Sequence, residues 1–434
     1  MEALPHLGRP HPLEKFRVVD ISCTDMKYIK LLIIIGFIVF GAYYGWLAYM
    51  NLRGARPAFG PPAGDIVQEI EKPAKNSTGF PLALPDGFSI SIFAKDLGDP
   101  RVLVFDPAGT LLVSIPSRGQ VVAMPDENHD GVADRTDVVV NYLNQPHGLA
   151  FHPKEKTLFV AETDRVVVYD YDPVTHKASN KKKIIDLPGG GNHFSRTIAF
   201  GPDGRLYIAV GSDCNVCVQT DERRAAILVA DVTALSAVTP KVYASGLRNS
   251  VFFTWHPVTR ELWATEMGRD LIGDDIPPDE VNIVKEGSFY GWPYCYGKNV
   301  RDATVPFKEP GAPSGRQTIS WVGCDAAVSS HIDIPAHSAP LGLAFIPPSW
   351  PAQYRDDLLV AYHGSWNRSE PTGYKVVRMK LDAKGNYEAT EDFITGWLTK
   401  DGALGRPVDL LFDVSGSLYI SDDKFGVIYR VTAS

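Results

Sequence analysis

The feature that most constrains the fold of this 434-residue chain is a motif that occurs six times: a short apolar strand ends in an aromatic residue and is followed by a turn and a second apolar strand. In the clearest copies the motif occupies residues 148–153 with 157–162, and residues 198–204 with 206–210. The aromatic markers of the six copies are Phe105, Phe151, Phe200, Trp255, Phe345 and Phe412. Their separations are 46, 49, 55, 90 and 67 residues. A propeller blade of four strands uses about 40–50 residues, so the repeat predicts an all-β, six-bladed β-propeller.

The propeller is expected to form one domain, residues 81–434, because the alternating strand pattern continues throughout this range. The long spacing between Trp255 and Phe345 predicts an insertion at residues 270–337, and ordered insertions of this length are usually functional. The innermost strands of a propeller surround one channel. Polar residues at equivalent positions of different blades should therefore meet there.

Residues 31–50 contain no charged side chain and are long enough to cross a hydrocarbon core of about 30 Å as a helix. Basic residues are more frequent before this stretch than after it, which predicts that residues 1–30 form a cytoplasmic tail. Residues 51–80 are rich in proline and glycine and are expected to act as a tether. We therefore expect a single N-terminal transmembrane helix that anchors the propeller on the periplasmic or extracytoplasmic side. A cleaved signal peptide is the alternative.

The four cysteines beyond residue 50 fall into two local pairs, Cys214 with Cys217 and Cys295 with Cys324. In an exported protein such pairs predict two disulfide bonds. Half a zinc site is the alternative for the first pair, but no second pair of ligands follows it. Haem attachment is excluded because Val218 stands where that motif requires histidine.

The charge of the chain bears on its partners. With 43 basic and 51 acidic residues the formal net charge is −8. Such a surface is poorly suited to a polyanion, so we expect no nucleic-acid partner.

Two consecutive repeats begin with side chains that suit catalysis or binding. His193 follows three glycines, and an imidazole there can serve as a general base near neutral pH. A hydrogen bond to a neighbouring blade is the alternative role. Arg248 and Asn249 stand at the same point of the next repeat, where arginine suits a carboxylate. An ion pair between blades is the alternative.

The fifth and sixth repeats add further candidates for ligand binding, which are His363, Trp366, Arg368 and Arg406. Together with Arg248 they place three arginines at comparable blade positions, which predicts a ligand with several carboxylates. A planar ligand can lie beneath Trp366. Ion pairs between blades are again the alternative.

Two acidic segments suit calcium, which prefers carboxylate and carbonyl oxygens. The first, residues 266–280, combines acidic residues with glycine and proline, and a solvated acidic loop is its alternative. The second has ligand residues at positions 1, 3, 5, 9 and 12 of a calcium loop and glycine at position 6. These residues are Asp126, Asn128, Asp130, Asp134 and Asp137. We expect a structural site there, away from catalysis, with an Asx-rich turn as the alternative.

Taken in order, the segments GNHFSR, FGPDGRLYIAVGS, GLRNS, EMGRD, HSAPLGLAF, HGSWNR and GRPVDL give the chain a recognisable pattern. It resembles the glucose/sorbosone dehydrogenases that use pyrroloquinoline quinone (PQQ), and most closely their sorbosone dehydrogenase branch. The resemblance covers residues 82–432. It implies a six-bladed propeller that holds the tricarboxylate quinone over its channel, with Ca²⁺ between the cofactor and the backbone.

By position, the resemblance implies that His193 is the general base. It implies cofactor contacts for Arg248, Asn249 and Arg406. The backbone carbonyls of Gly268 and Arg269 correspond to those that hold the catalytic Ca²⁺. A lysine of the soluble glucose enzymes is replaced by His363 or Arg368. Two further departures from those enzymes, which bear on sugar specificity, are Met267 and Val408.

The sequence as a whole predicts an exported, membrane-tethered enzyme that oxidises an aldose or a related sugar aldehyde or alcohol by hydride transfer to PQQ. His193 would act as general base and Ca²⁺ as Lewis acid. The electrons would pass to a separate acceptor, a quinone or a cytochrome, because the chain has no haem motif. The alternatives are a calcium-dependent propeller lactonase or esterase, and a non-catalytic propeller that binds sugars.

Overall fold

The computed structural model describes residues 34–45, 75–153, 156–305, 323–382 and 384–433. Residues 34–45 are helical and form part of a unit separate from the propeller. Within the described residues, no helix is both long and apolar enough to cross a membrane. The remainder of the expected transmembrane segment, residues 31–33 and 46–50, lies outside the described part, as does most of the expected tether.

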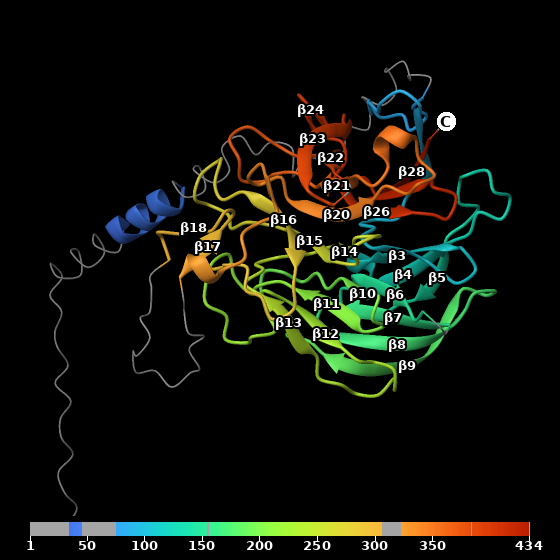
Figure 1. Ribbon diagram of the computed structural model, residues 1–434, viewed down its shortest axis with the longest axis horizontal. Helices are drawn as coiled ribbons and strands as arrows, with labels where there is room; N and C mark the ends of the chain where they lie inside the picture. Colours follow the sequence, from blue (N-terminus) through green and yellow to red (C-terminus); the bar gives the residue numbers. More distant parts are fainter. Residues whose placement is uncertain (1–33, 46–74, 154–155, 306–322, 383, 434) are drawn as a thin grey trace, which may run out of the picture. The chain divides into compact units, whose positions relative to one another are not determined.

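Six four-stranded antiparallel sheets follow one another along the chain (Figure 1). The first contains β2 (Leu103–Phe105), β3 (Leu111–Ile115), β4 (Gln120–Met124) and β5 (Asp137–Val140). The second contains β6 (Gly148–Phe151), β7 (Thr157–Glu162), β8 (Arg165–Asp172) and β9 (Lys177–Asp186). The third contains β10 (Ile198–Phe200), β11 (Leu206–Val210), β12 (Ala226–Ala230) and β13 (Lys241–Ser245).

The fourth and fifth sheets have the same antiparallel order. The fourth contains β14 (Phe253–Trp255), β15 (Leu262–Glu266), β16 (Asp279–Val284) and β19 (Ile332–Ile334). The fifth contains β20 (Pro340–Phe345), β21 (Leu358–Tyr362), β22 (Lys375–Leu381) and β23 (Tyr387–Ile394). Short ribbons and 3-10 turns lie between these strands: β17 (Cys295–Tyr296), β18 (Val300–Arg301), β24 (Leu398–Thr399), β25 (Gly402–Ala403), η2 (Pro116–Arg118), η3 (Cys324–Ala326) and η4 (Ala352–Tyr354).

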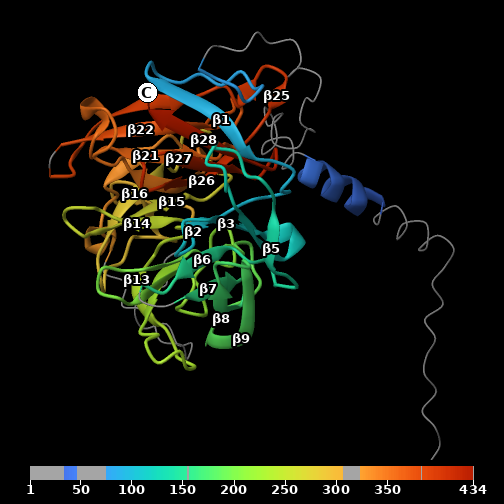
Figure 2. The same cartoon turned by 90° about the vertical axis from the view of Figure 1, so that its right-hand side faces the viewer.

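The sixth sheet closes the ring. It contains β26 (Pro407–Phe412), β27 (Leu418–Asp422) and β28 (Val427–Ala433) from the end of the chain, and its fourth strand is β1 (Phe88–Ala94) from the beginning. Figure 2 shows β1 beside β28, and their register runs from Phe88 opposite Ala433 to Ala94 opposite Ile428. The predicted all-β, six-bladed propeller is confirmed.

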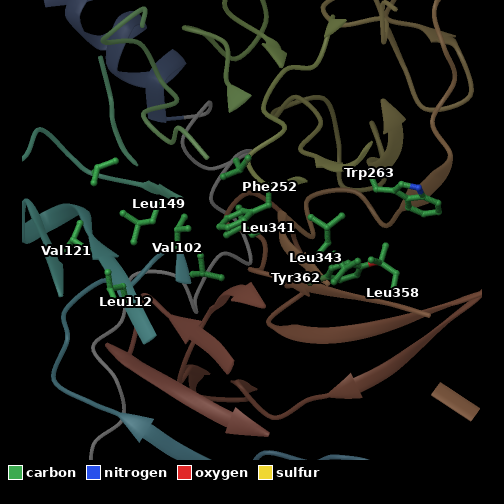
Figure 3. Close-up of a cluster of buried hydrophobic side chains, with 14 of the residues drawn as sticks. Val102, Leu112, Val121, Leu149, Phe252, Trp263, Leu341, Leu343, Leu358 and Tyr362 are labelled. Atoms are coloured by element: carbon green, nitrogen blue, oxygen red, sulfur yellow. The ribbon is translucent and has the colours of Figure 1, made fainter. Parts of the chain in front are cut away.

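Each aromatic marker is the last residue of the first strand in its blade, from Phe105 in β2 to Phe412 in β26. These strands contact one another across the blades, as in the pairs β2 with β26 and β6 with β10. They contribute to one buried apolar cluster that includes residues of all blades except the third (Figure 3). Val102, Leu149, Phe252 and Leu341 lie near the middle of this view. Apolar side chains next to or within the inner strands of five blades therefore belong to one buried cluster.

Two expected boundaries differ from the structure. Residues 75–80, expected in the tether, belong to the folded propeller: Asn76 donates hydrogen bonds to the carbonyls of Phe80 and Leu82, and Phe80 is 3% exposed. The expected insertion at residues 270–337 includes β16 and β19, which are strands of the fourth blade. The hydrophobic pattern of β16 is that of a blade strand, so β16 is not part of the insertion. The extra residues lie between β16 and β19.

The close approach of β6 and β10 gives a test of the ring. A Cβ atom on Gly148 would clash with the carbonyl of Arg196 and would lie 2.7 Å from the nitrogen of Ile198. Gly148→Ala should therefore force two inner strands apart and destabilise the protein by about 1–3 kcal/mol, the usual cost of overpacking. Thermal unfolding followed by circular dichroism measures the loss.

Gly204→Ala is the matched control, because its added methyl group would meet open space and only the positive φ of 79° opposes it. A loss of stability in Gly148→Ala no greater than that in Gly204→Ala would contradict the proposed close packing of the blades.

Candidate active site

Basic side chains from four blades gather at the end of the propeller where the innermost strands begin. These residues are Arg101 before β2, His147 before β6, Arg196 before β10 and Arg406 before β26. Burial lowers the pKa of His147, and the charges of Arg101 and Arg196 lower it further. Arg101 also acts on the pKa of Arg406. Blades that are distant in sequence thus place their charges within reach of one another, at one mouth of the channel.

The His193 imidazole is held in one orientation and is neutral. Its Nδ1 lies 2.8 Å from the carbonyl oxygen of Ser212 and 3.1 Å from the Ser212 hydroxyl. A carbonyl can only accept, so Nδ1 carries the hydrogen and Nε2 carries the lone pair. Burial, and next the charge of Arg248, lower the pKa of His193 to about 4. A neutral imidazole with a lone pair on Nε2 is the form that a general base requires.

Arg248 is 4% exposed and has an acceptor for each of its five N–H groups. Nε donates to the carbonyl of Asn215 at 2.8 Å, and Nη2 donates to its Oδ1 at 2.9 Å. Nη1 donates to the carbonyls of Met267 and Gly268 at 3.3 and 2.9 Å. Nη2 also pairs with Asp270 at 3.0 Å. This guanidinium therefore fixes the turn that follows β15.

Asn249 lies beside His193, with only Gly211 between them. A Cβ atom on Gly211 would be 2.5 Å from Oδ1 of Asn249 and 2.7 Å from Cβ of His193, so only glycine leaves room for both. The side-chain nitrogen of Asn249 lies 3.5 Å from the sulfur of Met267. Its backbone N–H donates to the buried carboxyl of Glu266 at 3.0 Å. The structure thus brings the expected base and both expected contacts of the fourth blade together.

The turn at Gly268 and Arg269 does not fit a calcium ion as it lies. The carbonyl of Gly268, an expected ligand, already accepts a hydrogen bond from the positively charged Arg248. A cation at this oxygen would be repelled by the guanidinium, while calcium needs six to eight oxygen ligands. Arg269 Nη1 is paired with Asp302 at 2.7 Å.

His363 and Arg406 meet at the fifth and sixth blades. Arg406 donates from Nε to the carbonyl of His363 at 3.0 Å and from Nη2 to that of Gly364 at 2.5 Å. His363 Nε2 contacts Asp423 at 2.8 Å, and the other oxygen of Asp423 contacts Arg101 at 2.5 Å. Although burial opposes ionisation, His363 and then Arg101 hold the pKa of Asp423 well below its usual range. Asp423 therefore joins blades five, six and one at the mouth.

Comparison with known proteins decides the family. Residues 82–434 match the family model described as TrAA12-like.

The chain belongs to this family.

An uncharacterized protein of Borreliella burgdorferi is 30% identical over 370 residues, which cover 81% of this chain and 90% of that protein. A PQQ-dependent pyranose dehydrogenase of Coprinopsis cinerea is 28% identical and matches 83% of this chain but only 56% of its own length, so this chain spans about half of that relative. The solved PQQ domain of a Coprinopsis cinerea pyranose dehydrogenase, in its holo form, is similar with a TM-score of 0.68, 26% identity, and coverage of 83% of this chain and 98% of the domain. The resemblance to PQQ-dependent sugar dehydrogenases is confirmed for the family, whereas these relatives do not distinguish its sorbosone branch.

The mouth of this TrAA12-like propeller carries positive charge that its own acids do not balance. Burial and the charge of Arg224 lower the pKa of Arg196 to about 10, a sign that cations are crowded. Within the described residues, one N–H or ring nitrogen on each of four buried basic groups has no partner: Arg101 Nε, His147 Nε2, Arg196 Nε and Arg224 Nη1. Arg101 is paired with Asp423 and the lowered pKa leaves His147 neutral, but Arg196 and Arg224 form no ion pair among the described residues. Uncompensated buried charge is costly, so the mouth fits a ligand with negative charge.

Arg368 and Trp366 have surroundings that differ from those of His363, the other candidate of the fifth blade. Arg368 donates to the carbonyl of Asp274 at 2.6 Å and pairs with the exposed Asp275 at 2.9 Å, so it holds the loop after β15. Trp366 is half-buried. The neighbouring Asn367, which the sequence did not single out, donates to Asp270 at 3.1 Å and so reaches the Arg248 network.

The loop at residues 126–137 has the contacts of an Asx-rich turn. The Asp126 oxygens accept the backbone N–H groups of residues 130 and 131, and Asp130 accepts that of residue 132. Asp137 turns away to Arg135 and His176, at 3.1 and 3.0 Å. Over the described residues, the one group of His, Cys, Asp and Glu side chains close enough to share a metal is Asp213 with Cys214 and Cys217. The calcium loop therefore stays a prediction.

Both expected disulfides are confirmed, Cys214–Cys217 and Cys295–Cys324. The first removes the alternative of half a zinc site, because bonded cysteines carry no free thiolate.

Sequence reasoning missed the residues that hold the others in place, chiefly Ser212, Asn215 and Asp423, and it considered Asp270 only as part of the acidic segment 266–280. Their contacts join loops of different blades, which no local pattern reveals. Among these residues, Asn215 alone had a feature in the sequence that could have indicated its role, which is its position between two cysteines.

The neutral state of His193 is testable without any ligand. Because burial and Arg248 disfavour the imidazolium, the ring nitrogens of His193 should keep the shifts of a neutral imidazole from pH 8 down to about pH 5 and titrate near pH 4. Nitrogen-15 NMR of the apoprotein measures this directly and also reports which ring nitrogen carries the hydrogen. A midpoint near the ordinary value of about 6.5 would contradict the described burial.

Proposed function

We propose that this chain is a quinoprotein sugar dehydrogenase that binds PQQ at the mouth of the propeller and oxidises an aldose or a related sugar aldehyde or alcohol. The observation that carries the proposal is the neutral His193, with Nε2 unprotonated, beside a mouth rich in buried positive charge. The names of the relatives support the cofactor and the class of substrate.

The residues divide the chemistry between them. When bound, PQQ supplies the acceptor for the hydride that leaves the sugar carbon. His193 Nε2 accepts the proton of the sugar hydroxyl, and the Ser212 carbonyl stabilises the resulting imidazolium through Nδ1–H. The basic groups of the mouth, including Arg101 and Arg406, favour the carboxylates of the cofactor. The two electrons then pass to a separate acceptor, a quinone or a cytochrome.

Calcium belongs to the proposal only through the resemblance, with the carbonyls of Gly268 and Arg269 as ligands. Because Arg248 occupies the Gly268 carbonyl, no step of the mechanism is assigned to the ion. A calcium-dependent lactonase or esterase would need carboxylates and amides from several blades around one cation. Among the described residues, the one group of three or more His, Cys, Asp and Glu side chains close enough to share a metal contains two bonded cysteines.

Titration of the purified apoprotein with PQQ, followed by tryptophan fluorescence, tests the proposal, and dye reduction with a panel of sugars measures turnover. We expect His193→Ala to lower turnover by about 10²–10⁴-fold and to keep PQQ binding, because the imidazole moves the proton and does not hold the cofactor. His129→Ala, at an exposed position in the 126–137 loop, is the control and should change neither quantity.

Absence of PQQ binding in the wild-type protein would remove the proposal. Parallel titrations with Ca²⁺ and with a chelator decide the calcium question. Tighter PQQ binding with Ca²⁺ keeps the ion in the proposal, and equal affinities remove it.

We further propose that residues 31–50 anchor the propeller to a membrane with the catalytic domain on the extracytoplasmic side. The uncharged sequence of this segment and the two disulfides, which form in oxidising compartments, support this. The full-length protein should sediment with membranes, and a chain that begins at residue 52 should not. Equal recovery of both chains in the supernatant would contradict the anchor.

A further inference from the structure

The segment Ser212–Cys217, which follows β11, lies between the two side chains on which the proposed function depends. On one side Ser212 contacts Nδ1 of His193 with its carbonyl and its hydroxyl, at 2.8 and 3.1 Å. The carbonyl of the next residue, Asp213, accepts the backbone N–H of Asn192 at 3.1 Å. The loop that carries the expected base is therefore fixed to this segment.

On the other side the same segment holds Arg248. The N–H of Ser212 donates to the Arg248 carbonyl at 2.8 Å. Asn215 accepts the guanidinium twice, with its backbone carbonyl at 2.8 Å and its Oδ1 at 2.9 Å. Because these two acceptors receive Nε–H and Nη2–H, they fix the plane of the guanidinium and not only its position.

Asn215 also reaches the turn of the fourth blade. Its Nδ2 donates to the carbonyl of Asp270 at 3.0 Å, and its Oδ1 accepts the N–H of Asp270 at 2.8 Å. Asp270 in turn pairs with Arg248 and accepts Asn367 from the fifth blade. Asn215 of the third blade therefore bonds directly to the fourth blade, and Asp270 extends these contacts to the fifth.

The disulfide Cys214–Cys217 closes a ring around Asn215 and Val216. Ser212 donates its hydroxyl to the carbonyl of Cys214 at 2.7 Å, which joins the ring to the contact with His193. A cross-link over so few residues restricts the loop to few conformations. Asn215 can then present its amide without a large loss of conformational entropy when the contacts form.

We propose that Asn215, held by the Cys214–Cys217 ring, is a positioning residue that orients Arg248 for the carboxylates of the cofactor. Ser212 in the same segment orients His193, so that the base and the cofactor contact are fixed relative to each other. The inference rests on the proposed function for its cofactor, but the contacts that hold Arg248 and His193 are a property of the apoprotein.

The first experiment therefore uses the apoprotein and needs no ligand. Asn215→Ala removes the acceptor of the Asp270 amide, so hydrogen exchange at Asp270, measured by NMR or mass spectrometry, should become about tenfold faster. Asn215→Asp keeps the acceptor of the Asp270 N–H but loses the Nδ2 donor to the Asp270 carbonyl, so its exchange should be intermediate between the wild type and Asn215→Ala. Asn299→Ala is the matched control, because Asn299 also bonds a loop carbonyl, that of Ala327, and contacts neither Asp270 nor Arg248 in the described structure.

The second experiment measures PQQ affinity by fluorescence titration of the same variants. Asn215→Ala and the double variant Cys214→Ser/Cys217→Ser should bind PQQ at least tenfold more weakly with little change in melting temperature, since Arg248 loses its orientation and the fold remains. Asn215→Asp should bind PQQ more weakly than the wild type because it adds a negative charge beside Arg248, and Asn299→Ala should bind as the wild type does.

The two experiments separate the failure of this inference from that of the proposed function. If the wild type does not bind PQQ, the proposed function fails, and the exchange rate at Asp270 still decides whether Asn215 holds the turn. If the exchange rate at Asp270 is unchanged in Asn215→Ala, or if Asn299→Ala loses as much PQQ affinity, Asn215 is not a positioning residue.

Discussion

The antiparallel pairing of β1 with β28 is the interaction on which the arrangement of this molecule depends. Without it the last blade would have three strands and an open edge, and the first blade would be held beside the sixth only by contacts such as β2 with β26 and Arg101 with Asp423. His193, Arg248 and Arg406 belong to the third, fourth and sixth blades. Although they are far apart in the sequence, the closed ring brings them to one mouth. The strand that closes the ring contributes no side chain to the chemistry proposed here, yet it sets the geometry of that chemistry.

The second constraint is the change from polar to apolar residues at the start of the inner strands. Arg101 is followed by Val102, and Arg406 is followed within two residues by Val408, which belongs to the same apolar cluster as Val102. The burial of the apolar residues is favourable, and the basic residues stand just before them in the chain. Crowding cations there is unfavourable for the apoprotein, and Asp423 offsets only part of it. A ligand that brings several negative charges relieves this cost.

How far the sequence could predict the molecule follows from which contacts are local. The blades could be predicted because each inner strand ends in an aromatic residue at a regular spacing, and the disulfides because their cysteines are close in sequence. The closing role of β1 could not, since pairing between the two ends of the domain leaves no local pattern. For the same reason His193 and Arg248 were found from their motifs, while Asn215, whose contacts cross between blades, was not, and Asp270 was considered only as part of an acidic segment.

Arg248 shows how the site can accept an anion and still resist a cation. A ligand carboxylate can replace Asp270 at Nη2, because Asp270 keeps its contacts with Asn215 and Asn367. One carboxylate then replaces another and the number of hydrogen bonds on the guanidinium does not change, although Asp270, whose side chain is 23% exposed, gives up its ion pair. A cation on the Gly268 carbonyl would instead require Nη1 to leave, with the loss of a charge-assisted hydrogen bond and added repulsion. The geometry that Asn215 imposes on this guanidinium therefore favours the carboxylates of a cofactor over a metal ion at the same turn.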